Sequence, residues 1–110
     1  MCGVAGIVNL KGRSVQQFEL KRMADAIAHR GPDGAGYWTN GPVGLAHRRL
    51  AILDLSQAAS QPMISPDGRS ALTYNGEIYN YLELRETLQR LGYVFRSRSD
   101  TEVVLCALQE

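Results

Sequence analysis

The second residue of the chain is a cysteine, and its position suggests nucleophilic chemistry. Cys2 directly follows Met1, so removal of the methionine would give Cys2 a free α-amine beside its thiol. The thiolate is the nucleophile in cysteine chemistry, and a free α-amine is partly neutral near pH 7. One residue would then supply both nucleophile and base, as in enzymes with an N-terminal threonine. Cysteines are more often small buried residues, so this interpretation needs support from the rest of the chain.

The two histidines suggest a cysteine–histidine pair, but the sequence favours structural roles for both. His29 falls at the end of a predicted helix, where a cation is favourable, and His47 precedes two arginines that disfavour its protonation. Cys106 lies in an apolar helical run and is expected to be an unreactive core residue. Because these residues show no local ligand pairing, we expect no metal site.

The first third of the chain predicts a strand and a helix that would position Cys2. Small and branched apolar residues over 3–9 indicate a buried strand. Ser14, with Gln17 three residues later, matches a capping box that opens a helix. The apolar stripe of that helix is Leu20, Met23, Ala24 and Ile27. Residues 31–36 are glycine-rich and are interpreted as a loop, which would permit a mobile lid.

The middle of the chain predicts strands separated by an irregular connection. Residues 43–47 and 49–53 are expected to form strands, or one strand with a bend. Residues 56–67 are polar and contain two prolines, which indicates an irregular connection. Residues 69–74 are interpreted as a further strand.

Two helices are predicted near the end of the chain. Asn80 would cap the first, with Glu83 at the third helical position and Tyr79 packed on Leu84 as a hydrophobic staple. Gly92 stands where a glycine usually ends a helix.

After a short predicted strand over 93–96, Ser99 and Glu102 form another capping box that opens the last helix. This mixture of strands and amphipathic helices predicts an α+β or layered α/β class. The sequence pattern does not order the layers.

Composition excludes several classes of function. The 110 residues suit one domain or part of one, and the formal net charge is +1. This charge is not the signature of a protein that binds nucleic acid or an anionic membrane. No apolar run approaches about 18 residues, and the N-terminus does not resemble a signal peptide. Two cysteines make no disulfide framework, so we expect the reducing cytoplasm.

Four further sequence blocks follow Cys2 in order: 29–33 (HRGPD), 46–54 (AHRRLAILD), 75–80 (NGEIYN) and 99–103 (SDTEV). With this ordered set, the chain resembles the class II glutamine amidotransferases, which are N-terminal-nucleophile hydrolases. It most resembles the glutaminase domain of glutamine-dependent asparagine synthetases. The resemblance implies an α+β fold that forms the N-terminal part of an αββα four-layer sandwich, with two antiparallel sheets between helical layers.

The resemblance implies hydrolysis of the glutamine side-chain amide. Cys2 would attack the amide carbon, ammonia would leave, and water would hydrolyse the thioester. The Asn75 side chain and the Gly76 N–H would donate to the oxyanion. The residues alone leave a hairpin turn as the alternative, because Asn-Gly is a strong turn signal. Against that alternative, the next residues lead into a predicted helix.

The resemblance also assigns the contacts to the substrate. Arg49 would hold the α-carboxylate through two parallel hydrogen bonds, with Arg48 on the opposite face of the strand. Asp100, assisted by Glu77, would hold the ammonium group, although an acid at a helix start also satisfies free N–H groups. The other residues implied to bind glutamine are Leu50, Ala51, Ile52, Leu53, Asn75 and Gly76.

The implied partners are L-glutamine and a synthetase domain of the same chain. That domain would use ATP and magnesium to activate aspartate and form asparagine, whereas residues 1–110 would hold no cofactor. The glutaminase domain of the family is longer, so residues 1–110 are expected to be an incomplete domain, and a homodimer of the full-length protein is a further possibility. Two alternatives stay open: a different carboxylate acceptor, or a non-catalytic module for glutamine binding or partner docking. Retention of Met1 would favour that module.

Overall fold

A three-stranded antiparallel sheet forms one half of the molecule. The computed structural model describes residues 2–51 and 56–110. In this sheet, β1 (Gly3–Val8) and β2 (Gly34–Asn40) flank β3 (Val43–Arg49). The start of β1 pairs with the end of β3, where Val4 lies opposite His47. This register brings the N-terminus next to the arginines of β3.

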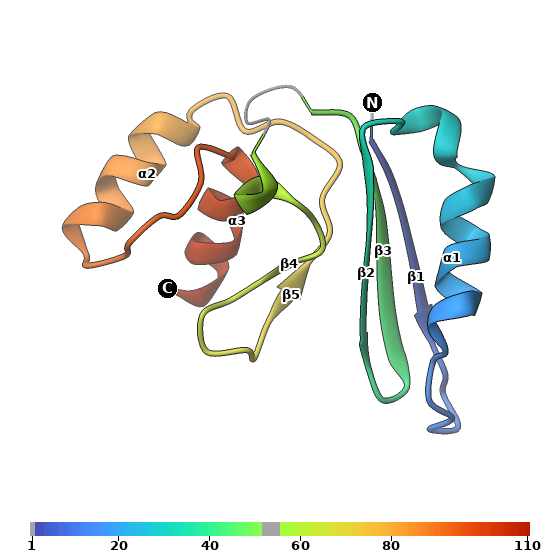
Figure 1. The fold of residues 1–110 in the computed structure, drawn as a ribbon. Coiled ribbons are helices and arrows are strands. Elements are labelled where there is room, and N and C mark those ends of the chain that lie inside the picture. The colour runs from blue at the N-terminus through green and yellow to red at the C-terminus, as the bar shows by residue number, and fades with distance from the viewer. Residues whose placement is uncertain (1, 52–55) are drawn as a thin grey trace.

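Helix α1 (Gln17–Ala26) covers one face of this sheet (Figure 1). Leu20 and Ala24 are fully buried there and pack with Val15 and Ala46. The predicted helix start at Ser14 is wrong. The N–H of Val15 donates to the Gly41 carbonyl at 2.8 Å, so this segment is held against the turn between β2 and β3 before the helix begins.

The apolar stripe predicted for α1 is confirmed only in part, because Met23 is exposed. After α1 the chain continues through a short 3₁₀ helix, η1 (Ala28–Arg30).

A smaller sheet and two helices form the other half. Strands β4 (Met63–Ile64) and β5 (Ala71–Leu72) pair antiparallel, and helix α3 (Asp100–Gln109) packs on them. Helix α2 (Tyr81–Arg90) packs on α3. Figure 1 shows the resulting order of helix, sheet, sheet and helix. The predicted α+β class with antiparallel sheets is confirmed.

Several predicted elements differ from the structure. Residues 34–36, predicted as loop, belong to β2, because their backbone pairs with β3 despite the two glycines. Residues 93–96, predicted as a strand, are irregular. Strand β5 is shorter than the predicted 69–74. The predicted connection over 56–67 contains a 3₁₀ helix, η2 (Gln57–Ala59), a cis peptide bond before Pro62, and β4.

The starts of the last two helices follow the prediction in position but not in every contact. Asn80 is the N-cap of α2 but makes no capping hydrogen bond with its side chain. The predicted staple is absent, since Tyr79 is 92% exposed. Gly92 ends α2 with a φ of 103°, which glycine adopts without strain. No helix in residues 2–51 and 56–110 is long and apolar enough to cross a bilayer.

Helix α3 begins with the predicted cap, although the reciprocal bond is different. The Ser99 hydroxyl accepts the N–H of Thr101 at 3.1 Å. The Glu102 carboxylate accepts the N–H groups of Ser97 and Arg96, at 2.7 and 2.9 Å, and does not turn back to Ser99. These bonds fix the approach to α3, where Asp100 lies.

Candidate functional site

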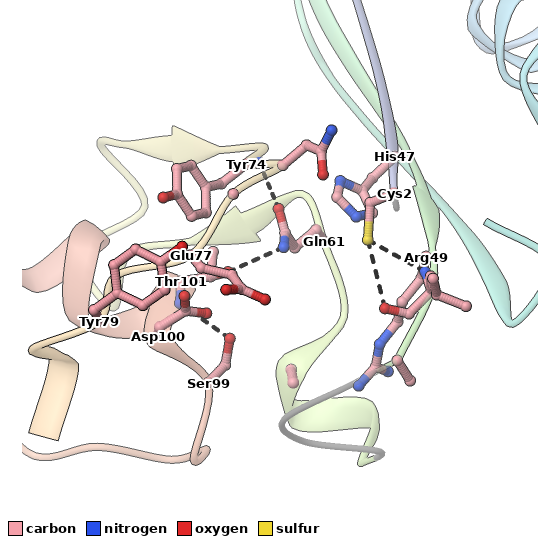
Figure 2. A pocket seen from close by; sticks show the side chains of 15 residues that line it. Cys2, His47, Arg49, Gln61, Tyr74, Glu77, Tyr79, Ser99, Asp100 and Thr101 are labelled. Atoms are coloured by element: carbon pink, nitrogen blue, oxygen red, sulfur yellow. Dashed lines mark hydrogen bonds between the residues drawn. The ribbon is translucent and has the colours of Figure 1, made fainter. Parts of the chain in front are cut away.

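A cavity of about 430 Å³ lies where the end of β3 faces the segments that precede α2 and α3. It brings together residues from every one of the sequence blocks except 29–33. Figure 2 shows Cys2 and Arg49 on one side and Glu77 and Asp100 on the other. The lining residues are Cys2, His47, Arg49, Leu50, Ala51, Ala59, Gln61, Tyr74, Asn75, Gly76, Glu77, Tyr79, Ser99, Asp100 and Thr101.

The Cys2 sulfur is held by the backbone of Leu50. The Leu50 N–H donates to Sγ at 3.2 Å, and the thiol lies 3.6 Å from the Leu50 carbonyl oxygen (Figure 2). The next residue, Gly3, is buried, and a Cβ there would lie 2.8 Å from Cδ1 of Ile27. The glycine therefore lets Ile27, at the end of α1, approach the strand beside Cys2. Arg30 adds a hydrogen bond from Nε to the Cys2 carbonyl at 3.1 Å.

The 29–33 block lies behind the cavity and supports it. The Asp33 N–H donates to the Arg49 carbonyl at 2.9 Å, and the Asp33 carboxylate accepts the N–H of Ala51 at 2.9 Å. A Cβ on Gly31 would overlap the backbone carbonyl of Arg48 and lie 2.6 Å from the Arg49 nitrogen. Only glycine fits this crossing, so the block holds the end of β3 in place.

The two arginines of β3 have different partners. Arg49 lines the cavity, and its guanidinium donates to the Ser56 carbonyl at 2.8 Å. Arg48 does not line it, and its Nε donates to the Gly31 carbonyl at 3.1 Å. The expectation that strand alternation separates them is confirmed, because Arg49 shares its face with His47.

Asn75, Gly76 and Glu77 line the opposite wall of the cavity. The chain continues from them into α2 and not into a returning strand, so the hairpin alternative is wrong. A Cβ on Gly76 would lie 2.6 Å from the Tyr74 hydroxyl, so the glycine permits close contact with this ring. Burial, and then the negative charges of Asp100 and Glu77, raise the pKa of Tyr74 and keep its phenol neutral.

Asp100 is both a helix residue and a wall of the cavity. It is the first residue of α3, it is buried, and its Oδ2 accepts the N–H of Ile78 at 3.0 Å. Asp100 therefore lies at a helix start and also faces the cavity, so a structural role at the helix start and a role toward a ligand are compatible for this acid. The carboxylate also ties the start of α3 to the segment that carries Glu77.

His47 is 1% exposed and is electrically neutral near pH 7. Burial, followed by the positive charge of Arg49, lowers its pKa to about 4. Its Nδ1 lies 2.9 Å from the Thr73 hydroxyl, so the predicted structural hydrogen bond is present, while Nε2 is buried without a protein partner. His29 is exposed and lies outside the cavity.

Cys106 is buried, as predicted, and burial raises the pKa of its thiol. A neutral thiol in the apolar core is a poor nucleophile compared with a thiolate. Within the described residues, no three His, Cys, Asp or Glu side chains are grouped so that they could hold a metal ion.

Several cavity residues were missed by the sequence analysis. Gln61 and Thr101 contact each other inside the cavity, at 3.1 Å between Nε2 and Oγ1. Thr101 could have been found from the sequence, because it follows Asp100 at a predicted helix start. Gln61 lies in the connection over 56–67, where no periodicity marks it. Two residues implied to bind glutamine, Ile52 and Leu53, lie outside the described residues.

The site thus combines a thiol at position 2, a layered α+β fold and a cavity with a guanidinium on one side and two carboxylates on the other. The glutamine amidotransferase domain model matches residues 1–110. The chain therefore belongs to the glutamine amidotransferase domain family.

Longer proteins that are similar to this chain support its assignment to this family. The chain is 45% identical over 113 residues to "Asparagine synthetase [glutamine-hydrolyzing] 2" of Bacillus subtilis, covering 100% of this chain and 15% of the relative. It is 44% identical to "Asparagine synthetase [glutamine-hydrolyzing] 1" of the same organism, covering 96% and 17%. It is 39% identical to "Probable asparagine synthetase [glutamine-hydrolyzing]" of Schizosaccharomyces pombe, covering 100% and 20%. The chain thus spans a fifth or less of the length of these three proteins.

Proposed function

We propose that this chain forms the glutaminase site of an amidotransferase that hydrolyses the side-chain amide of glutamine. The observation that carries the proposal is the convergence of Cys2, Arg49, Asn75–Gly76 and Asp100 on one cavity. These residues come from four separated segments of the chain. Family membership and the names of the relatives support the same activity.

The nucleophile is the thiol of Cys2 after removal of Met1. The free α-amine accepts the thiol proton, directly or through one water, and the sulfur attacks the amide carbon of glutamine. The Leu50 N–H lies 3.2 Å from the sulfur and donates a hydrogen bond to it, which fixes the direction of the thiol. His47, whose pKa is lowered to about 4, is a weak proton acceptor near pH 7, so the α-amine serves as the base of this site.

The tetrahedral intermediate needs donors for its oxygen. The side-chain amide of Asn75 and the backbone N–H of Gly76 are the two donors, and each such donor is typically worth about 10²–10³ in rate. Collapse of the intermediate breaks the carbon–nitrogen bond, and ammonia leaves with the proton from the amine. Water then hydrolyses the thioester and releases glutamate.

The charged groups of the cavity select the amino-acid end of the substrate. Arg49 pairs with the α-carboxylate, because a guanidinium matches a carboxylate with two hydrogen bonds. Asp100 and Glu77 face the α-ammonium group from the other side of the cavity. The backbone of Leu50 and Ala51 completes the floor.

The ammonia is consumed by a synthetase domain of the same polypeptide, which forms asparagine from aspartate. This step rests on the names of the relatives. ATP and magnesium supply the activation of the aspartate carboxylate in that domain.

Covalent labelling tests the glutaminase site. The longest natural polypeptide that contains residues 1–110 is treated with a diazoketone analogue of glutamine, and the adduct is located by peptide mass spectrometry. We expect one adduct, on the sulfur of an N-terminal Cys2, with loss of glutaminase activity. Cys106→Ala should still be labelled, whereas Cys2→Ala should be neither labelled nor active with glutamine and should keep ammonia-dependent synthesis. A retained Met1, or a label on Cys106, would contradict the proposal and favour a binding module.

A further inference from the structure

Gln61 connects two segments of the chain that line the wall of the cavity across from Cys2 and Arg49. Its Oε1 accepts the N–H of Tyr74 at 2.6 Å, and its Nε2 donates to the Thr101 hydroxyl at 3.1 Å. Tyr74 directly precedes Asn75, and Thr101 directly follows Asp100. Figure 2 shows these bonds to Tyr74 and Thr101, so one carboxamide connects the residue before the proposed oxyanion donors to the residue after the proposed ammonium site.

The backbone of Gln61 is itself anchored to the three-stranded sheet. A Cβ on Gly36 of β2 would overlap the Gln61 carbonyl oxygen, so this carbonyl rests directly on the strand backbone. Strand β2 pairs with β3, and β3 pairs with β1 next to Cys2. The Gln61 side chain thus relates the far wall of the cavity to the sheet that carries the nucleophile.

The chemistry of this position requires a carboxamide of this length. Tyr74 needs an acceptor and the Thr101 oxygen receives a donor, and glutamine presents one of each at the end of the same side chain. Leucine would leave the Tyr74 N–H without this partner, and asparagine is one methylene too short to reach both. A cross-link that served stability alone would not need to lie in the wall of the cavity, where Gln61 lies.

We propose that Gln61 is a positioning residue that sets the distance between the Asn75–Gly76 donors and Asp100, and through it the fit of glutamine to Cys2. This inference rests on the proposed function. Loss of the Tyr74 bond misplaces the oxyanion donors, whereas loss of the Thr101 bond alone shifts the ammonium site. The two bonds therefore have separable kinetic consequences.

Three variants of the complete polypeptide test the inference. Gln61→Leu removes both bonds, and Thr101→Val removes only the second. The matched control is Gln57→Leu on the same connection, because Gln57 is exposed and its side chain bonds only Ser60 among the contacts seen. Glutaminase KM is measured together with kcat per active site. Active sites are counted by the diazoketone adduct, so that unfolded molecules do not contribute to kcat.

We expect kcat of Gln61→Leu to fall about 10–100-fold, since a displacement of about 1 Å has effects of this size. Thr101→Val should raise KM about 3–10-fold, as expected for one lost hydrogen bond, with kcat within about twofold of the wild type. Gln57→Leu should match the wild type in both.

A second readout separates positioning from stability. Glutamate γ-semialdehyde accepts the thiol across its carbonyl, with sulfur bonding to carbon and the thiol proton passing to the oxygen, and this adduct needs the oxyanion donors. Its inhibition constant should rise in Gln61→Leu by the same factor as kcat/KM falls. A purely structural lesion would lower the number of titrated sites and leave both constants unchanged.

The outcomes are distinguishable from failure of the proposed function. A wild-type protein without glutaminase activity would overturn the function itself. An active wild type with unchanged constants per site in Gln61→Leu would overturn the positioning role. If Gln61→Leu gives no folded protein, an unchanged KM in Thr101→Val overturns it instead.

Discussion

The carboxylate of Asp33 accepts the backbone N–H of Ala51 at 2.9 Å, across 18 residues of sequence. The backbone of Asp33 also donates to the Arg49 carbonyl at 2.9 Å. The end of β3, which carries Arg49 and the Leu50 N–H that contacts the Cys2 sulfur, is therefore held from behind by a block that does not itself line the cavity.

Asp33→Ala is expected to weaken glutamine binding without removing the nucleophile. The variant leaves the Ala51 N–H without its acceptor, and one hydrogen bond of this kind corresponds to about a 3–10-fold rise in KM. Asp33→Asn is the matched control, because its amide oxygen can still accept. Steady-state kinetics per titrated site measures the effect, and equal KM values for the alanine variant and the wild type would refute this support.

Gly31→Ala is expected to lower the free energy of unfolding by about 1–3 kcal/mol. The added Cβ would overlap the Arg48 carbonyl, and this neighbour is backbone of the central strand. Denaturant unfolding measures the change. Gly34→Ala is the control three residues away, where the nearest atom to the new Cβ is 3.9 Å distant. If both variants lose the same stability, the steric explanation fails.

Acidification is expected to destabilise the fold through His47. Burial, with the positive charge of Arg49, lowers its pKa from 6.5 to about 4. Between these values the unfolded chain binds a proton that the folded chain does not. The free energy of unfolding therefore falls as the pH drops from 6.5 toward 4, by up to about 3 kcal/mol.

Urea unfolding of the complete polypeptide near pH 7 and near pH 5 measures this effect. His47→Gln lacks the titrating ring and should show a smaller loss between the two conditions. The same loss in the variant and in the wild type would mean that other groups cause it.

Arg49→Lys is expected to raise KM for glutamine about 10–100-fold, because lysine cannot form two parallel hydrogen bonds to a carboxylate. Arg48→Lys is the comparison, since its guanidinium bonds the Gly31 carbonyl and does not line the cavity. It should change stability more than KM. The reverse pattern would identify Arg48 as the carboxylate-binding residue.

Local rules were sufficient for much of the fold. A run of small and branched apolar residues predicted β1, although Val4 and Val8 are exposed and the strand is not buried as expected. Capping residues predicted the starts of α2 and α3 at Asn80 and Ser99. The same rules failed where long-range contacts decided. Val15 is held by the turn at Gly41 and delays α1, and pairing with β3 turns the glycine-rich residues 34–36 into strand.

The sequence by itself determined which groups carry the proposed chemistry. A thiol at position 2, a guanidinium, an Asn-Gly pair and an acid at a helix start are properties of residue type and order, and their ordered pattern indicates the family without reference to the fold. Their proximity was implied only by resemblance, because residues up to 98 positions apart meet through strand register and layer packing.

Only the tertiary structure decided how these groups are supported. The Asp33–Ala51 bond and the two bonds of Gln61 join segments 18, 13 and 40 residues apart. No periodicity or propensity records such bonds, because each depends on where two distant backbones cross. The reacting groups can therefore be predicted from the sequence. The residues that hold these groups in position relative to one another can be identified only from the tertiary structure.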